Sequence, residues 1–301
     1  MSTAAVQENL KPKNASWINA SLYPYQTFTY QLPIGAMRYV DKGQGEPIVM
    51  VHGNPVWSFV YRKLIDGLSD TYRCIVPDHI GFGQSSKPHE WTYLPRDHSA
   101  NLTSLLDWLK VDGITLVVQD WGGPIGLGYA VEHPERVKRL VILNTWLWPV
   151  NDDWYYQAFS GFVGGRLGRF LCRRFNFFAR WVVWMAYGNK KKLTPEIHRH
   201  YLDALSTGDS RKGTWVFPKE IIGSTEWLRS LWSQRERIAA KPTMIAWGMK
   251  DIAFREKELQ RWTSLFPQAQ VTRFAGAGHY VQDEEGEAIA QLMREFLAIH
   301  S

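Results

Sequence analysis

V-V-Q-D-W-G-G, residues Val117–Gly123, runs from the end of an apolar strand pattern into the glycine-rich start of a helix. The turn between the two elements carries a carboxylate, Asp120, followed directly by an indole, Trp121. A serine at this kind of turn would indicate acyl transfer, because a hydroxyl there attacks a carbonyl carbon. An aspartate followed by a tryptophan indicates displacement at a saturated carbon instead.

The bulk composition is that of a folded protein of ordinary size. The chain has 301 residues, enough for one large domain with an insertion or for two small domains. With 45% hydrophobic and 21% charged residues, the chain does not have the composition of a disordered protein. Many of its 15 Trp, 13 Tyr and 14 Phe residues fall between Trp146 and Trp232, so this segment differs in character from the rest.

Cysteine usage and apolar patterning favour a cytoplasmic setting. Cys74 and Cys172, the only two cysteines, suggest neither a disulfide framework nor a metal cluster, so a reducing compartment is the simplest expectation. Met1–Asn9 lacks a basic segment followed by an apolar one, which argues against a secretory signal. No apolar run approaches the length that crosses a bilayer, so we expect no membrane span.

Apolar runs bounded by turn residues alternate with helical patterns, which predicts a mostly parallel sheet covered by helices. The expected strands are Pro47–Val51, Cys74–Pro77, Thr115–Val118, Leu140–Asn144, Thr243–Trp247 and Gln270–Phe274. Gln26–Leu32 and Ala36–Val40 precede them as an expected antiparallel hairpin. Helical patterns cover Phe59–Leu68, Arg96–Lys110, Pro124–Glu132, Lys257–Phe266 and Glu284–Ile299. The fold class is therefore α/β, with eight strands.

The alternation of strands and helices stops between Pro149 and Arg235, where the pattern is helical, aromatic and rich in glycine. We interpret this segment as a helical cap inserted into the sheet domain. The predicted organisation is a first core part at residues 1–148, the cap at 149–235 and a second core part at 236–301.

Eight basic residues and no acid lie within the cap between Arg166 and Lys192. Interleaved with them are Phe170, Phe175, Phe177, Phe178, Trp181 and Trp184. Such a stretch could form a membrane-surface or nucleic-acid face. The alternative, which we favour from the sequence, is amphipathic helices with inward aromatics and solvated arginines. We expect no nucleic-acid partner, and self-association through the cap stays open.

Three chemically versatile side chains follow predicted strands. Asp120 follows Thr115–Val118, Asp251 follows Thr243–Trp247, and His279 follows Gln270–Phe274. Sites in open α/β sheets form outside the carboxyl ends of the strands, so all three can converge. A single Asp after a strand is usually a turn or helix-capping residue. The three together, in the order nucleophile, acid and histidine, predict a catalytic triad.

Asn54 and Trp121 add two side-chain N–H donors to this predicted site. Asn54 directly follows His52-Gly53 after the strand Pro47–Val51. Two such donors beside a carboxylate would hold a departing anion rather than a carbonyl oxygen. The alternative makes Asn54 a turn residue, since Asn-Pro is a common turn dipeptide, and Trp121 a core residue.

Four stretches of the sequence resemble those of a known protein family. They are H-G-N-P-V-W-S-F-V-Y-R (52–62), P-D-H-I-G-F-G-Q-S-S-K-P (77–88), V-V-Q-D-W-G-G (117–123) and G-A-G-H-Y-V-Q-D-E (276–284). These stretches closely resemble the haloalkane dehalogenases of the α/β-hydrolase superfamily, and the likeness spans both core parts. It implies the α/β-hydrolase fold, a mostly parallel eight-stranded sheet flanked by helices with an inserted helical cap. The cap matches in position and composition, but it carries no motif that can be aligned.

The resemblance also assigns the site residues. Asn54 and Trp121 match the family's halide-binding pair, and Asp251 matches its later acid position. The alternative acid position, after Leu140–Asn144, has no carboxylate, and this combination looks like the family's third subfamily. Val118 stands where the general hydrolase turn has a small residue, a departure that the family shares.

The family resemblance implies hydrolysis of haloalkanes to an alcohol, halide and a proton. Asp120 would attack the carbon that bears the halogen, and His279 would activate water to cleave the resulting ester. Asp251 would orient His279, and backbone N–H groups of Asn54 and Trp121 would form the oxyanion hole. The expected partners are a small apolar halogenated substrate, water and halide. No metal or organic cofactor is expected.

Three rival functions use the same fold. An epoxide hydrolase would need cap tyrosines to protonate the epoxide oxygen, and the cap offers Tyr155, Tyr156, Tyr187 and Tyr201. Asn54 and Trp121 argue against it, because they suit a spherical anion and have no role in epoxide opening. A coelenterazine-type oxygenase is more distant. A catalytically silent receptor for a small molecule would have no need of all three triad residues.

Overall fold

The computed structural model describes residues 14–300 and contains one eight-stranded sheet in the order β1-β2-β4-β3-β5-β6-β7-β8. The expectation for Met1–Asn9 therefore lies outside the described residues. The strands are β1 (Thr27–Leu32), β2 (Gly35–Lys42), β3 (Pro47–Val51), β4 (Arg73–Pro77), β5 (Ile114–Gln119), β6 (Val137–Leu143), β7 (Thr243–Gly248) and β8 (Gln270–Phe274). All eight predicted strands are confirmed, with ends shifted by up to three residues.

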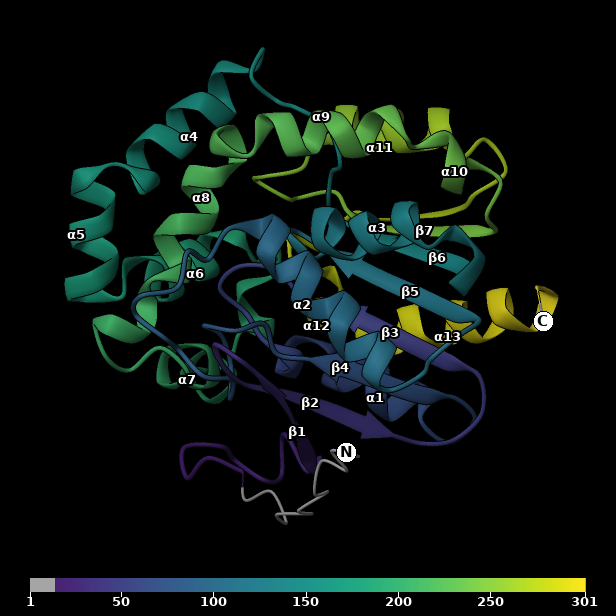
Figure 1. Cartoon of the computed structure of the whole chain (residues 1–301), viewed down its shortest axis with the longest axis horizontal. Coiled ribbons are helices and arrows are strands. Elements are labelled where there is room, and N and C mark those ends of the chain that lie inside the picture. The colour runs from purple at the N-terminus through teal and green to yellow at the C-terminus, as the bar shows by residue number, and fades with distance from the viewer. Residues whose placement is uncertain (1–13, 301) are drawn as a thin grey trace, which may run out of the picture.

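Strand direction also follows the prediction. The hairpin β1–β2 and the pair β2–β4 are antiparallel, whereas every pairing from β4 to β8 is parallel (Figure 1). Every residue of β5 is buried, because helices cover a parallel sheet on both faces. Alternate residues of β3 belong to different core clusters: Val49 and Val51 to one, Ile48 and Met50 to the other. The apolar runs seen in the sequence thus reflect burial on both sides.

Two groups of helices form these clusters with the sheet. On one face lie α2 (Pro95–Trp108), α3 (Gly122–Glu132) and α11 (Glu256–Leu265), and on the other α1 (Arg62–Leu68) and α13 (Gly286–Ile299). A short 3-10 turn, η1 (Ser58–Tyr61), precedes α1, and α12 (Val281–Glu284) precedes α13. Another 3-10 turn, η2 (Pro134–Arg136), joins α3 to β6. The five helical patterns predicted for the core are confirmed, although two of them are each divided into two elements.

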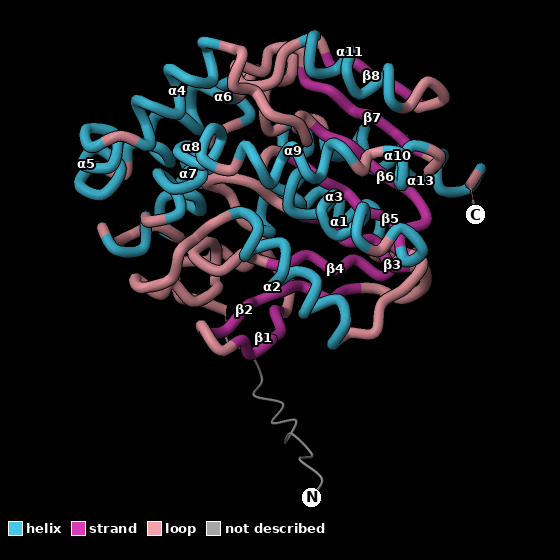
Figure 2. Tube along the Cα trace, turned by 45° about the horizontal axis from the view of Figure 1, so that its top comes forward, coloured by secondary structure: helices cyan, strands magenta, loops and turns pink. Residues whose placement is uncertain are grey.

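The segment between β6 and β7 contains helices and no strand in the structure. These are α4 (Trp154–Gly164), α5 (Arg166–Phe175), η3 (Phe178–Val182), α6 (Val183–Ala186), η4 (Lys190–Lys192), α7 (Pro195–Asp203), η5 (Asp209–Arg211), α8 (Gly213–Gly223), α9 (Thr225–Ser233) and α10 (Glu236–Ala239). Helices α4 to α8 gather beyond one end of the strands (Figure 2). This segment corresponds to the predicted cap, whose boundaries at 149 and 235 remain a prediction.

The prediction that the cap aromatics face inward is right for Phe178, which is buried, and wrong for four others. Phe170, Phe175, Trp181 and Trp184 are exposed. These four side chains therefore lie on the solvent sides of α5, η3 and α6. Across residues 14–300, none of the helices is long and apolar enough to cross a membrane.

Candidate active site

Asp120 occupies the sharp turn between β5 and α3. Its φ angle is +51°, in the left-handed region that a residue with a Cβ adopts at a cost. Close packing beside the turn requires glycine. A Cβ at Gly122 would lie 1.9 Å from the carbonyl oxygen of Val51, and one at Gly123 would lie 1.8 Å from Thr145 Oγ1. The glycines let the helix start directly under the carboxylate, which therefore points out of the sheet edge.

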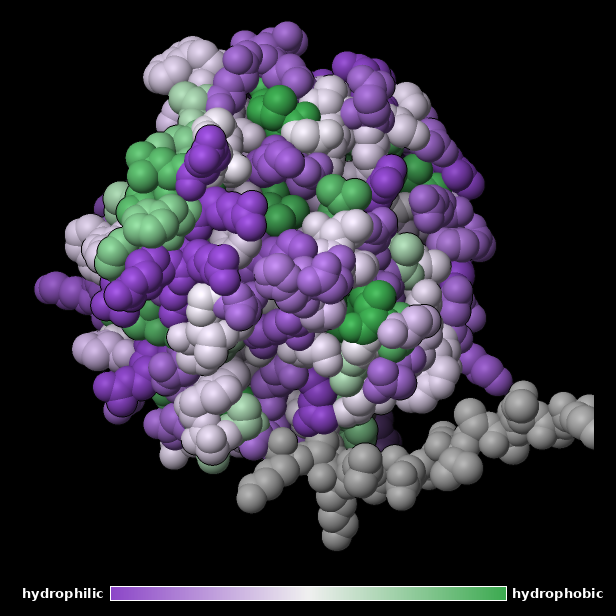
Figure 3. Space-filling model, turned by 60° about the vertical axis from the view of Figure 1, so that its left-hand side comes forward, coloured by the Kyte–Doolittle hydropathy of each residue, from purple (hydrophilic) through white to green (hydrophobic). Residues whose placement is uncertain are grey.

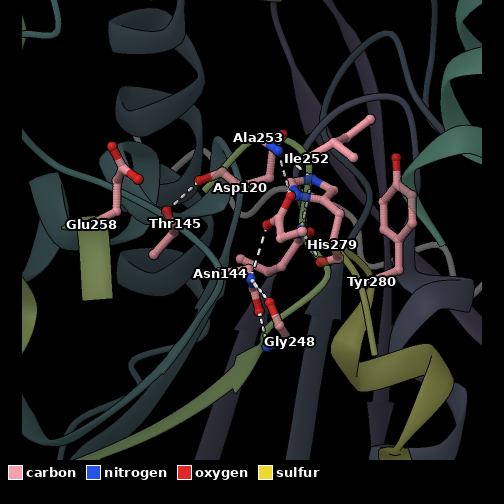
Figure 4. Close-up of polar contacts among 12 residues, drawn as sticks. Asp120, Asn144, Thr145, Gly248, Ile252, Ala253, Glu258, His279 and Tyr280 are labelled. Carbon is pink, nitrogen blue, oxygen red and sulfur yellow. Dashed lines mark hydrogen bonds and ion pairs between the residues drawn. The ribbon is translucent and has the colours of Figure 1, made fainter. Parts of the chain in front are cut away.

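Asp120, Asp251 and His279 come together at this edge. Figure 4 shows Asp120 and His279 with the polar contacts around them. The Nδ1 of His279 lies 3.0 Å from Asp251 Oδ2, and its Nε2 lies 3.7 Å from Asp120 Oδ2. All three residues are nearly or fully shielded from solvent. When Nδ1 carries the proton and donates it to Asp251, the lone pair of the imidazole is on Nε2, the ring nitrogen next to the nucleophile. The histidine can then accept a proton from a water beside Asp120.

Backbone N–H groups hold the Asp120 carboxylate from the opposite side. The N–H of Asn54 donates to Oδ1 at 2.7 Å, and the N–H of Trp121 also bonds the carboxylate. Gly53 makes this approach possible, because a Cβ there would lie 2.2 Å from Asp120 Oδ1. The side chains of Asn54 and Trp121 line the same pocket as the carboxylate. Both predicted donor residues thus lie around Asp120, and their roles remain predictions.

Burial and charge shift the pKa values of the two reactive groups. Burial raises the pKa of the Asp120 carboxyl, and the nearby His279 and the two backbone N–H groups only partly offset this. Burial alone lowers the pKa of His279, but the carboxylates of Asp251 and Asp120 outweigh it, so the net pKa is raised. The histidine is therefore tuned to receive a proton, since carboxylates flank the imidazolium on both ring nitrogens.

Two polar residues that the sequence analysis did not assign hold the triad in place. Asn144, the first residue after β6, donates through Nδ2 to Asp251 Oδ2 at 2.8 Å and to the Gly248 carbonyl at 3.1 Å. Its Oδ1 accepts the Gly248 N–H at 2.7 Å, so the acid is fixed to two strand ends. Gln119 Nε2 donates to the His279 carbonyl at 3.1 Å and lies 2.9 Å from His279 Nε2. Their positions at the ends of β6 and β5 were the only signal available in the sequence.

The pocket in front of Asp120 is mostly apolar. Its lining from the core includes Trp146, Ile252 and Phe254, and its lining from the cap includes Phe159, Phe178 and Val182. An apolar lining keeps water away from the carboxylate and accommodates an uncharged organic substrate.

The hydroxyls of the four cap tyrosines are already engaged with the protein. Tyr155 donates to the Ile252 carbonyl at 2.5 Å and Tyr156 to the Ala253 carbonyl at 2.8 Å. Tyr187 and Tyr201 each donate to Asp283 Oδ2 at 2.5 Å. Each phenolic proton is therefore directed at a protein oxygen. An epoxide hydrolase needs such a proton on the substrate.

Five other histidines serve the packing of the fold. His52 accepts the His79 backbone N–H at Nε2, 2.9 Å away, and His79 and His98 are fully buried. His198 and His200 bond backbone groups of the cap and of the segment before β1. Within residues 14–300, no three His, Cys, Asp or Glu side chains are placed to hold a metal ion.

Comparisons with known proteins agree with this geometry. A family model described as alpha/beta hydrolase fold matches residues 46–286. The haloalkane dehalogenase 2 of Mycobacterium tuberculosis (strain ATCC 25618 / H37Rv) is 34% identical over 91% of this chain and 96% of its own length. A protein of Xanthomonas campestris pv. campestris named cis-3-alkyl-4-alkyloxetan-2-one decarboxylase is 38% identical over 91% of this chain and 98% of its own.

Solved structures give the same fold. The haloalkane dehalogenase DatA from Agrobacterium tumefaciens C58 has a TM-score of 0.84 at 22% identity, covering 94% of this chain and all of its own. At that identity the likeness concerns the fold alone, so the chemistry rests on the residues around Asp120.

Proposed function

Since the chain belongs to the haloalkane dehalogenase family of the α/β-hydrolase fold and is an enzyme of that family, we propose that it hydrolyses haloalkanes through a covalent ester of Asp120. The observation that carries this proposal is the setting of the carboxylate. Asp120 faces an apolar pocket between the N–H donors of Asn54 and Trp121, with His279 and Asp251 behind it.

In the first step, Asp120 attacks the carbon that bears the halogen. A carbon–oxygen bond forms as the carbon–halogen bond breaks, and the electron pair leaves with the halide. Negative charge moves from the buried carboxylate to the halogen. The side-chain N–H groups of Asn54 and Trp121 stabilise the halogen where this charge develops. The product is an alkyl ester of Asp120 and a bound halide.

In the second step, His279 removes a proton from water, which attacks the carboxyl carbon of the ester. Oxyanion charge develops on Oδ1, where the backbone N–H of Asn54 lies 2.7 Å away and that of Trp121 is also directed at the carboxylate. Asp251 stabilises the imidazolium that forms. Collapse of the intermediate expels the alcohol, which takes the proton from His279, and leaves Asp120 as a carboxylic acid. Loss of that proton to solvent restores the carboxylate, so the products are alcohol, halide and a proton. These two reaction steps need no metal or organic cofactor.

A second candidate function starts with the same attack. The relative named as an oxetan-2-one decarboxylase is 38% identical, against 34% for the dehalogenase. Asp120 would attack the saturated ring carbon that bonds the ring oxygen of a four-membered lactone. The bond between that carbon and the ring oxygen breaks, and the freed carboxylate stays attached through the alkyl chain. Loss of carbon dioxide from that end, with departure of the Asp120 carboxylate, would give an alkene. Asn54 and Trp121 would stabilise an oxygen anion in place of halide.

One panel separates the candidates by their products. The full-length protein is given 1,2-dibromoethane and 1-bromohexane, a cis-3,4-dialkyloxetan-2-one, and an epoxide. Bromide and alcohol identify the dehalogenase, and alkene with carbon dioxide identifies the decarboxylase. Diol from the epoxide alone would contradict both proposals, and binding without any product would assign the protein as a receptor.

The halide-binding pair can be tested separately from the nucleophile. We expect Asn54→Ala and Trp121→Phe each to lower the rate of halide release by about 10²–10³-fold, since each removes one donor from the developing anion. Single-turnover halide release measures this step. Phe178→Leu is the matched control, because Phe178 lines the same pocket and its side chain has no N–H or O–H donor. An equal loss in all three variants would contradict the assignment.

The pH profile should follow the raised pKa of His279. Ester hydrolysis requires the neutral imidazole, so its rate is full above that pKa and falls as the pH drops through it. We therefore expect the acid limb above the ordinary histidine value of about 6.5. Asp251→Asn removes the principal charge that raises this pKa, so the limb should move to lower pH while the rate falls. A wild-type limb below pH 6 would contradict this.

A reducing, cytoplasmic setting also remains a proposal. Cys74 and Cys172 are both free and buried, and burial raises the pKa of the Cys74 thiol to about 12. Such thiols are inert core residues that require no oxidising compartment.

A further inference from the structure

Helix α5 presents an apolar face to solvent. Leu167, Phe170 and Leu171 lie at positions i, i+3 and i+4, so they share one side of the helix. Leu167 is 59% exposed, Phe170 is 56% exposed and Leu171 is half-buried, whereas Gly168 and Cys172 are buried. Isolated exposed apolar residues are normal on a protein surface, but a row of them along one helix is not.

The exposed apolar residues extend beyond α5 to the neighbouring cap segments. Trp154 and Phe162 of α4 are exposed, as are Trp181 of η3 and Trp184 of α6. Ring contacts connect parts of this surface: Phe162 with Phe177, and Phe177 with Trp181. The side of the molecule that carries these segments shows apolar side chains next to strongly polar ones (Figure 3). We call the exposed side chains of α4, α5, η3 and α6 the cap face.

Basic side chains border the cap face. Arg166, Arg169 and Arg173 follow one another along the side of α5 next to the apolar row. Arg173 pairs with Asp209, whereas Arg166 and Arg169 make no ion pair with any of the residues 14–300. Arg180 stacks over Trp181 and Lys190 over Trp184. From Trp154 to Lys192 the chain has no acidic residue. The border is therefore complementary to an anionic surface.

The same segments line the pocket on their inner side. Phe159 of α4, and Phe178 and Val182 of η3, contact the pocket, while their neighbours along the chain form the cap face. One layer of helix thus separates the active-site pocket from the exposed aromatic surface. An apolar substrate dissolved in a bilayer would be concentrated next to this layer.

We propose that the cap face docks the protein onto an anionic lipid membrane, with the aromatic and leucine side chains inserted at the headgroup boundary and the arginines on the lipid charges. Trp, Phe and Leu on one face with Arg on its flank are the residues that bind this interface. Lipid is favoured over nucleic acid because bulky aliphatic and aromatic groups make up most of the face, whereas the arginines lie along its side and, at Arg174, at the end of the α5 row. This inference stands independently of the reaction catalysed.

The test is flotation of the full-length protein with vesicles of phosphatidylcholine, with and without phosphatidylglycerol. We expect binding to the anionic vesicles that weakens at high salt. The double variant Arg166→Glu/Arg169→Glu should lose binding by about tenfold or more, and Leu167→Gln/Phe170→Gln should lose a similar factor. The charge-conserving variant Arg166→Lys/Arg169→Lys should keep it.

Matched controls lie away from the cap face. Arg96→Glu/Arg237→Glu changes the net charge by the same amount, and Ile299→Gln removes an apolar residue that is 74% exposed. Neither should alter flotation. Equal binding by the cap-face variants and the controls would overturn the proposal, as would absence of wild-type binding. Loss of a wild-type dimer in Leu167→Gln/Phe170→Gln, without vesicle binding, would assign the face to self-association and also overturn it.

Discussion

Asp120→Ala should abolish halide release from every haloalkane that the wild-type protein accepts. The variant lacks the only carboxylate among residues 14–300 that lines the pocket beside Asn54 and Trp121, and water cannot displace halide in its place. Removal of a catalytic nucleophile typically lowers kcat by about 10⁴–10⁶-fold, so we expect a rate below detection. Ion-selective detection of bromide from 1,2-dibromoethane measures it. Under the decarboxylase candidate, the same variant should give no alkene from the lactone.

Structural damage must be separated from chemical loss in this variant. Asp120 has a φ of +51°, so alanine keeps the strain of the turn but loses the hydrogen bonds from the backbone N–H groups. Thermal unfolding shows whether the fold persists. Halide quenching of tryptophan fluorescence shows whether Trp121 still binds the anion. Asp152→Ala, which removes an exposed carboxylate of the cap, is the matched control. A folded Asp120→Ala protein with more than about 1% of wild-type turnover would refute the assignment.

The core of the fold could be predicted because parallel strands buried on both faces give uninterrupted apolar runs. β3 and β8 were predicted to the residue, since Pro47 and the glycine-containing turns after Val51 and Phe274 mark their ends. The site was equally accessible, because strand ends in such a sheet meet at one edge. Asp120, Asp251 and His279 could therefore be placed together from three strands far apart in the sequence.

Side-chain partners across the sheet could not be predicted in this way. In the sequence, Asn144 stood out only because its position has no carboxylate. In the structure its side-chain amide holds Asp251, which lies 107 positions away along the chain. Likewise, which oxygen accepts the hydrogen bond from each cap tyrosine hydroxyl depends on the packing of α4 and α7. The sequence therefore left open an epoxide reaction that these hydroxyls do not support. The exposure of Phe170 and Trp181 was missed for a related reason. Helical periodicity gives the sides of a helix but not which of them is covered.

His279→Phe should stop the reaction after one turnover. The first step needs only Asp120 and the halide donors, so one equivalent of halide should still be released. The second step loses its general base, a change that costs about 10²–10⁴-fold in rate. The alkyl ester of Asp120 should then accumulate. Mass spectrometry of the intact protein should show the added alkyl group, and peptide mapping should place it on Asp120.

The contrast with Asp251→Asn makes this prediction specific. That variant keeps the imidazole, so it should turn over slowly and accumulate only part of the ester. The difference follows from the geometry, because His279 Nε2 faces Asp120 and Asp251 contacts the ring only through Nδ1. Phenylalanine can fill the buried ring position beside Phe254 and Tyr280, so the fold should persist. Repeated turnovers by His279→Phe would mean that another group activates water, and the histidine would then lose its assigned role.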